Sequence, residues 1–167
     1  MARRSHPAAL RIFEAVHAWL RSVRLPVRFG HESFLVTTDH AAVEITYDPY
    51  RDALVVHGMW PKEATVDTLE RLTNFVDFWN VNRIQPIGYM LTGEDASLGV
   101  GCVVHLPDAS QCSAEELGDA VDHYLAMVDI FFIEMEHFLP DVCGTTVDHH
   151  PYMLRLPTMP IIESPPR

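Results

Sequence analysis

Residues 69–91, LERLTNFVDFWNVNRIQPIGYML, are the stretch that decides the fold. The first half spaces its apolar residues for a helix that closes on Phe78-Trp79-Asn80, and Ile84 to Leu91 then has the pattern of a strand. This direct step from helix to strand predicts a domain that combines helices with a sheet. No catalytic signature accompanies it, so the sequence favours a binding or regulatory domain.

The segments before this stretch predict one helix and three strands. Residues 8–23 carry apolar side chains three or four positions apart, with charged and polar side chains between them, as in an amphipathic helix. After Pro26 the apolar period shortens to two, which predicts strands at 34–38, 43–47 and 53–60. Turn residues separate the strands, so we expect an antiparallel meander.

The segments on the other side predict two more helices and a hairpin. Thr65 is expected to cap the second helix, whose apolar stripe comprises Val66, Leu69, Leu72, Val76 and Trp79. Strands at 84–91 and 98–106 are joined by residues typical of turns and should form a hairpin. Ser113 and Glu116 have the spacing of a capping box, which begins a third helix that ends before Pro140.

The predicted fold class is therefore α+β, with the order helix, three strands, helix, two strands, helix and one antiparallel sheet packed against the helices. The length of 167 residues and the apolar content of 48% suit a single core. We expect residues 1–140 to form that one domain. Residues 141–167 are rich in proline and are expected to be an extended or disordered tail.

Charge is distributed unevenly along the chain. Residues 1–28 hold six Arg and one acidic residue, a net charge of +5, whereas the remainder holds six basic and 22 acidic residues, a net charge of −16. Residues 84–154 contain twelve acidic residues and neither Lys nor Arg. Because nucleic acids and anionic lipids are bound through clustered Lys and Arg, we expect no nucleic acid and no membrane as partners.

The remaining composition indicates a cytoplasmic protein. No apolar run approaches the roughly 20 residues that a membrane-spanning helix needs. Charged residues from Arg11 onward interrupt the N-terminal apolar stretch that a signal peptide would require. Cys102, Cys112 and Cys143 are odd in number and lack the spacing of a zinc or redox pair, which suits a reducing compartment.

Several groupings of His, Glu and Cys are candidate metal sites. Glu14 and His17, like Glu134 and His137, have the i, i+3 spacing of di-iron carboxylate proteins, but those sites need a four-helix bundle. The tail holds zinc-type ligands without paired spacing, namely Cys143, Asp148, His149 and His150. Gly99 and Gly101 lack the third glycine of a phosphate loop and predict a close backbone approach instead. We expect neither a metal nor a cofactor.

The chain resembles the YbjN family of proposed bacterial sensory transduction regulators, whose fold is similar to that of type III secretion chaperones. The resemblance rests on the Phe78-Trp79-Asn80 helix end, the hairpin that follows it, and the pattern from Ser113 to Pro140. It covers roughly residues 8–140. It implies no catalytic residues, and it implies a small acidic domain, dimeric, that acts through proteins.

These observations lead to one principal hypothesis and two alternatives. The principal one is a non-catalytic regulatory or chaperone-like domain, a homodimer that binds a segment of a protein partner on its sheet or along its edges. Met59, Trp60 and Tyr89 are the strand residues expected to offer exposed apolar area to that partner. The alternatives are a metal-dependent sensor or enzyme that uses His and Glu residues, and a subunit of a heterodimer with a related chain.

Overall fold

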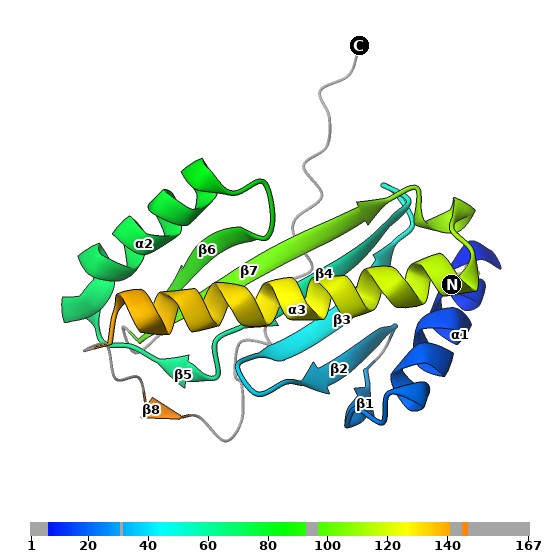
Figure 1. Cartoon of the computed structure of the whole chain (residues 1–167), viewed down its shortest axis with the longest axis horizontal. Coiled ribbons are helices and arrows are strands. Elements are labelled where there is room, and N and C mark those ends of the chain that lie inside the picture. The colour runs from blue at the N-terminus through cyan, green and yellow to red at the C-terminus, as the bar shows by residue number, and fades with distance from the viewer. Residues whose placement is uncertain (1–6, 31, 93–96, 141–144, 147–167) are drawn as a thin grey trace, which may run out of the picture.

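The computed structural model of the chain describes residues 7–30, 32–92, 97–140 and 145–146. Within them one antiparallel sheet of six strands carries three helices (Figure 1). The spatial order of its strands is β1-β2-β3-β4-β7-β6. Their bounds are β1 Val27–Phe29, β2 Ser33–Thr37, β3 Ala42–Asp48, β4 Ala53–Met59, β6 Ile87–Thr92 and β7 Leu98–Pro107. This α+β architecture is the one that the sequence predicts.

The helices are α1 Pro7–Ser22, α2 Leu69–Asn82 and α3 Ala114–Phe138. Figure 1 shows α3 crossing the near face of the sheet, with α1 beside its N-terminal end and α2 beside its C-terminal end. One core joins the three helices to this face, and it includes Ile12, Val43, Val56, Cys102 and Phe131, all with no exposed surface. The opposite face of the sheet carries none of the three helices.

The long helix α3 begins with the expected capping box. The Ser113 side chain accepts a hydrogen bond from the Glu116 N–H, and the Glu116 carboxylate accepts one from the Ser113 N–H at 2.7 Å. These contacts satisfy two donors that a helix start leaves unpaired. The hydrogen bonds from Ser113 hold the pKa of Glu116 below its usual range. The helix then extends for 25 residues and buries eight side chains or glycines against the sheet and its neighbours.

The sequence does not predict three short strands, because two or three residues are too few to show the two-residue apolar period of a strand. The first is β1, at the edge of the sheet beside β2. The others are β5, Lys62–Glu63, and β8, Thr145–Thr146, which pair with each other. Thr145–Thr146 lies within the segment predicted to be a tail, and the rest of that segment, including Cys143, Asp148, His149 and His150, lies outside the described residues.

The start of the second helix also differs from the prediction. Thr65 precedes a 3-10 turn, Val66–Thr68, and α2 begins only at Leu69. Val66 and Leu69 are exposed, so the buried stripe consists of Leu72, Phe75, Val76 and Trp79. The prediction fails because the apolar period continues across the turn, while the change of helix type rotates its residues away from the core.

Candidate functional site

The structure corrects the expectation that Met59 and Trp60 are exposed. Their exposed fractions are 0% and 2%, and Tyr89 is half-buried. Met59 lies on the sheet face that bears no helix, where the Tyr89 hydroxyl is 3.6 Å from its Sδ atom. Gly101 is the cross-strand neighbour of both residues, and a Cβ there would lie 2.4 Å from the Tyr89 ring. The missing side chain therefore lets this ring lie close to the sheet beside Met59.

Trp60 is buried because its indole is part of a polar contact with α3. Its Nε1 donates to Glu136 at 2.9 Å, and Lys62 donates to the same carboxylate at 2.6 Å. Burial acts to raise the pKa of Glu136, but the hydrogen bonds from Lys62 and Trp60 outweigh it and hold that pKa below its usual range. These contacts fasten the β4–β5 connection to α3, and they use the polar atom that a partner could otherwise have bound.

The Phe78-Trp79-Asn80 helix end protects an edge of the sheet. The Asn80 side chain donates to the Gly88 carbonyl at 2.9 Å and accepts from the Gly88 N–H at 2.8 Å, and Trp79 donates to the Pro86 carbonyl. Trp79 is buried, as predicted, but Asn80 bonds to β6 and not to the end of its own helix. An exposed edge strand invites pairing with other chains, and Asn80 occupies the β6 edge at Gly88.

The sheet face without helices contains an uncharged histidine. His57 in β4 is paired across the strands with Glu44, and His105 in β7 lies nearby on the same face. Burial, together with the neighbouring His105, lowers the pKa of His57 to about 4. Burial likewise lowers the pKa of His105. Both rings are therefore held in the neutral form at neutral pH.

This burial predicts that acid weakens the fold through His57. An unfolded histidine binds a proton below about pH 6.5, whereas the folded one binds it only near pH 4, so stability is lost as the pH falls between these values. We expect the free energy of unfolding of the natural protein to drop relative to that of His57→Gln by on the order of 2 kcal/mol from pH 7.5 to pH 4.5. Urea titrations at both values measure it. Parallel pH profiles for the two proteins would contradict the prediction.

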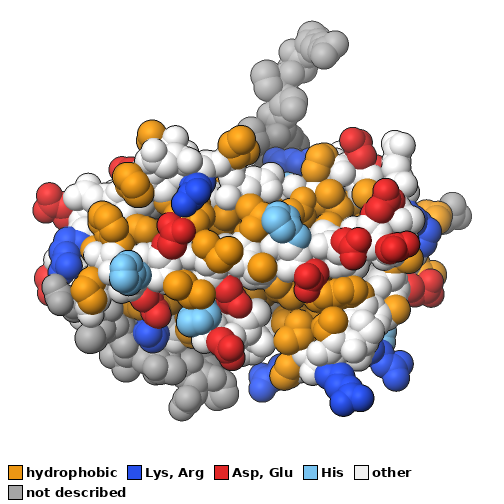
Figure 2. Space-filling model, viewed as in Figure 1, with side chains coloured by type: hydrophobic (Ala, Val, Ile, Leu, Met, Phe, Trp, Pro, Cys, Tyr) orange, Lys and Arg blue, Asp and Glu red, His pale blue; other side chains and the backbone are white. Residues whose placement is uncertain are grey.

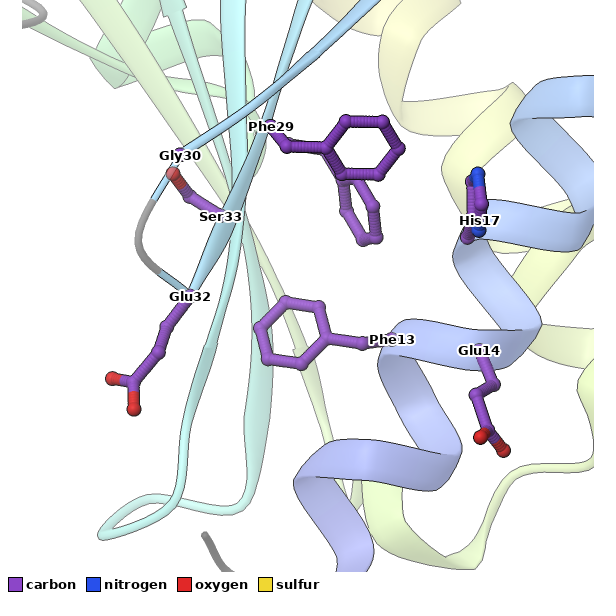
Figure 3. A pocket seen from close by; sticks show the side chains of 8 residues that line it. Phe13, Glu14, His17, Phe29, Gly30, Glu32 and Ser33 are labelled. Atoms are coloured by element: carbon purple, nitrogen blue, oxygen red, sulfur yellow. The ribbon is translucent and has the colours of Figure 1, made fainter. Parts of the chain in front are cut away.

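A hollow lies between α1 and the β1–β2 hairpin (Figure 3). This hollow, here called the α1–β1 groove, has a volume of about 250 Å³. Its lining residues are Phe13, Glu14, His17, Phe29, Gly30, Glu32, Ser33 and Phe34. Four rings form its floor and walls: Phe34 contacts Phe13 and Phe29 edge-on at 5.5 and 5.7 Å and stacks with His17 at 5.9 Å.

The groove is apolar inside and open to water. Phe29 has an exposed fraction of 66% although it belongs to a strand, and Leu10 is exposed on the neighbouring turn of α1. Large rings that remain in water on a folded domain are typical of contact surfaces. In Figure 3 the rings of Phe13 and Phe29 point into the groove, and the carboxylates of Glu14 and Glu32 point away at one end of it.

An unpaired strand edge borders the groove. β1 pairs with β2 on one side and is the last strand of the described sheet on the other. The Gly30 N–H donates to the Ser33 carbonyl at 2.9 Å, so Gly30 and Ser33 form a hydrogen-bonded pair. Non-hydrogen-bonded and hydrogen-bonded pairs then alternate along the two strands. By that alternation Arg28 exchanges hydrogen bonds with Leu35, and the N–H and C=O groups of Val27 and Phe29 point away from the sheet.

Sequence reasoning missed this site because its parts are separated and individually ordinary. Phe13 and His17 read as one flank of an amphipathic helix, and Phe29 lies in a strand too short to predict. The only available signal was the run Val27-Arg-Phe29 between Pro26 and Gly30, which is apolar at alternate positions.

The described residues contain no group of three or more His, Cys, Asp or Glu side chains that could hold a metal ion. Glu14 and His17 lie on one flank of α1 as their spacing predicts, and Glu134 pairs with Arg83 at 3.5 Å. Cys102 is buried, and burial raises the pKa of its thiol far above the usual range. It is therefore an unreactive core residue.

Comparison with known proteins places the fold but no family. No family model and no curated protein matches the chain. Among solved structures the chain is similar to YbjN from E. coli, a proposed transcription regulator, with a TM-score of 0.62 and 10% identity over 75% of this chain and 91% of that one. It is also similar to the HopA1-SchA chaperone-effector complex, with a TM-score of 0.55 and 16% identity over 79% of this chain and 98% of that one. The chain has the fold that YbjN and this chaperone complex share.

Proposed function

We propose that the protein is a non-catalytic binding domain that holds an extended segment of a protein partner in the α1–β1 groove. The observation that carries the proposal is the combination of an aromatic groove with an unpaired strand edge. Backbone groups at such an edge supply affinity for any extended chain, and an adjacent pocket selects the side chains. The fold shared with a chaperone-effector complex supports a protein as the partner.

A peptide-display selection on the purified protein tests this function. Selected peptides should bind the natural protein and lose at least about tenfold in affinity with Phe29→Ala, because truncating an aromatic hot-spot residue at the centre of an interface costs about 2 kcal/mol or more. Tyr50→Ala is the matched control, since Tyr50 is also an exposed aromatic residue but lies in the β3–β4 turn. Peptides that bind both variants equally, or a selection that enriches none, would refute the proposed site.

We also propose that the protein is a homodimer, joined through an apolar surface on α2 and α3. This α2–α3 surface comprises Phe78, Val81, Ile84 and Phe138, whose exposed fractions range from 55% to 93%. Phe78 and Phe138 stack at 6.0 Å. Figure 2 shows hydrophobic side chains over α2 and the neighbouring end of α3, with basic and acidic side chains between them. Given about 150–250 Å² for a whole aromatic side chain, the surface offers roughly 400–600 Å² of apolar area.

This area is most of the roughly 800 Å² that each partner buries in a standard interface. The charges of Arg83 and Glu134 beside this surface neutralise each other, although the chain has a net charge of −11. A nearly uncharged apolar surface is best matched by another such surface, and a second copy of this chain supplies one.

No described helix is both long and apolar enough to cross a bilayer. The described cysteines are free thiols, which suits the reducing cytoplasm where we propose the protein acts.

Sedimentation velocity tests the dimer. The natural protein should sediment as a dimer at about 10–50 μM, and Phe78→Asp should sediment as a monomer, because a desolvated, unpaired carboxylate at an interface costs several kcal/mol. Tyr50→Asp should remain dimeric and controls for the added charge. A monomeric natural protein, or a dimeric Phe78→Asp variant, would show that this surface does not join two copies.

A further inference from the structure

We propose that the α1–β1 groove binds a segment in one direction only: as a seventh, antiparallel strand beside β1, with a basic N-terminal end, a large apolar side chain at its centre and an acidic C-terminal end. This inference rests on the proposed function, because it specifies the segment that the same groove would hold. The charges at the two ends of the groove and the direction of β1 together fix this orientation.

The groove has an acidic end. Glu14 on α1 and Glu32 after the β1–β2 turn are both exposed, and Figure 3 shows them flanking one end of the groove from opposite sides, with their carboxylates pointing outward. This end lies beyond Phe29 and Gly30, where β1 finishes. A segment lying along β1 would therefore pass between the Glu32 side of the hairpin and the Glu14 side of α1, and a Lys or Arg there could reach either carboxylate.

The other end of the groove is basic. Arg21 lies one and two helical turns beyond His17 and Glu14 on the same flank of α1, and Arg24 lies in the connection that leads into β1. Arg28 follows within β1, where its alternation with Val27 and Phe29 places it on the opposite face of the sheet, so only Arg21 and Arg24 belong to this end; all three arginines are exposed. No ion pair joins them to a carboxylate of the described residues. A segment that passes Val27 on the groove side would therefore meet two guanidinium groups, those of Arg21 and Arg24, which favour Asp or Glu.

The direction of β1 determines how a bound segment must be oriented to match these charges. β1 runs from Val27 at the basic end to Phe29 at the acidic end. Every strand pair in the described sheet is antiparallel, and antiparallel pairing is somewhat more stable per residue than parallel pairing. An antiparallel seventh strand would begin at Glu32 and end at Arg24. Its own basic residues must then come first and its acidic residues last.

The aromatic floor determines the centre of the segment. The outward N–H and C=O groups of Val27 and Phe29 are spaced to bond every second residue of a new strand. Side chains of that strand on the helix side would lie beside Phe29 and His17, whose rings are 5.1 Å apart. A volume of about 250 Å³ accommodates one aromatic or large aliphatic side chain. Three paired residues span about 10 Å, so charged residues two or three positions to either side reach both ends of the groove.

Two peptides of identical composition test the orientation. The first is Lys-Lys-Thr-Val-Phe-Val-Thr-Glu-Glu and the second is Glu-Glu-Thr-Val-Phe-Val-Thr-Lys-Lys, both labelled with fluorescein and blocked at both ends. Fluorescence anisotropy with the full-length protein should show at least about tenfold tighter binding of the first peptide at 50 mM salt. The difference should shrink at 1 M salt, where the Debye length is about 3 Å. The variant Glu14→Lys/Glu32→Lys/Arg21→Glu/Arg24→Glu should prefer the second peptide, and these four exposed positions make it a safe change for folding.

Each other result overturns the inference in a distinct way. Tighter binding of the second peptide would mean a parallel strand. If both peptides bind equally well and Phe29→Ala weakens both, the groove binds peptides as proposed. The charges at its ends would then not determine the direction of the segment. Binding of neither peptide would reject the described segment, and the display selection would then decide whether the groove binds any peptide.

Discussion

Replacing Phe131 by alanine is expected to lower the free energy of unfolding by about 3–5 kcal/mol. Phe131 has no exposed surface and contacts Phe75, Trp79 and Phe132 with ring centroids 5.0–5.5 Å apart. Its ring also lies against Gly88, where a Cβ would come within 2.9 Å of it. One side chain of α3 thus packs against α2 and the edge strand β6, so its loss leaves a cavity that no single element can close.

Urea denaturation measures this effect against a neighbour on the same helix. Ile133→Ala removes a comparable side chain that is 43% exposed, and it should cost less than about 1 kcal/mol. If Phe131→Ala fails to fold, Phe131→Leu retains most of the volume and should still cost more than Ile133→Ala. Equal costs at positions 131 and 133 would show that the α2–α3 contact contributes little to stability.

Replacing Gly58 by alanine is expected to cost about 1–3 kcal/mol, because it would overpack the contact between β4 and α3. A Cβ at Gly58 would lie 2.3 Å from Cγ1 of Val128 and 3.2 Å from Sγ of Cys102. Val128 and Cys102 are both fully buried, so neither has open space to move into. The long helix can approach the sheet this closely only because residue 58 has no side chain.

A double-mutant cycle separates overpacking from a general loss of strand propensity. Val128→Ala alone should also destabilise the protein, by about 2 kcal/mol, because it leaves a cavity. The combination of Gly58→Ala with Val128→Ala should cost at least about 0.5 kcal/mol less than the two single changes together, since each relieves the defect of the other. Simple additivity would contradict the steric explanation.

The two proposed contact surfaces lie on different parts of the fold and can be tested independently. The α1–β1 groove belongs to the basic N-terminal part of the chain, and the α2–α3 surface belongs to the opposite end of α3 (Figure 1). The two edges of the sheet differ. The Asn80 side chain hydrogen-bonds to Gly88 on the outer edge of β6, whereas no described strand pairs with Val27 and Phe29 on the outer edge of β1. This difference supports the proposal that a partner segment pairs with β1.

Local patterns were sufficient to predict most of the elements. The apolar spacing of α1 correctly places Val16 and Leu20 on its buried face, although Leu10 and Val23 of the same expected stripe are exposed, and the capping box at Ser113 begins α3 where the sequence predicts. The close approach expected at Gly101 is present beneath Tyr89. These features depend on residues that are neighbours in the sequence, because helical and strand periods and caps arise within one or two turns.

The sequence by itself determined the α+β class, the order of the main elements and the uneven charge of the two parts of the chain. Only the tertiary structure decided which apolar residues remain in water: Met59 and Trp60 are buried, while Phe29 and Phe78 are exposed. The physical reason is that burial depends on which distant segment covers a side chain. Trp60 is covered through Glu136, 76 residues away, and Phe29 lies on an edge strand with no described strand beyond it. A period of two or 3.6 residues identifies a face of an element, but the partner of that face is set by the packing of the whole chain.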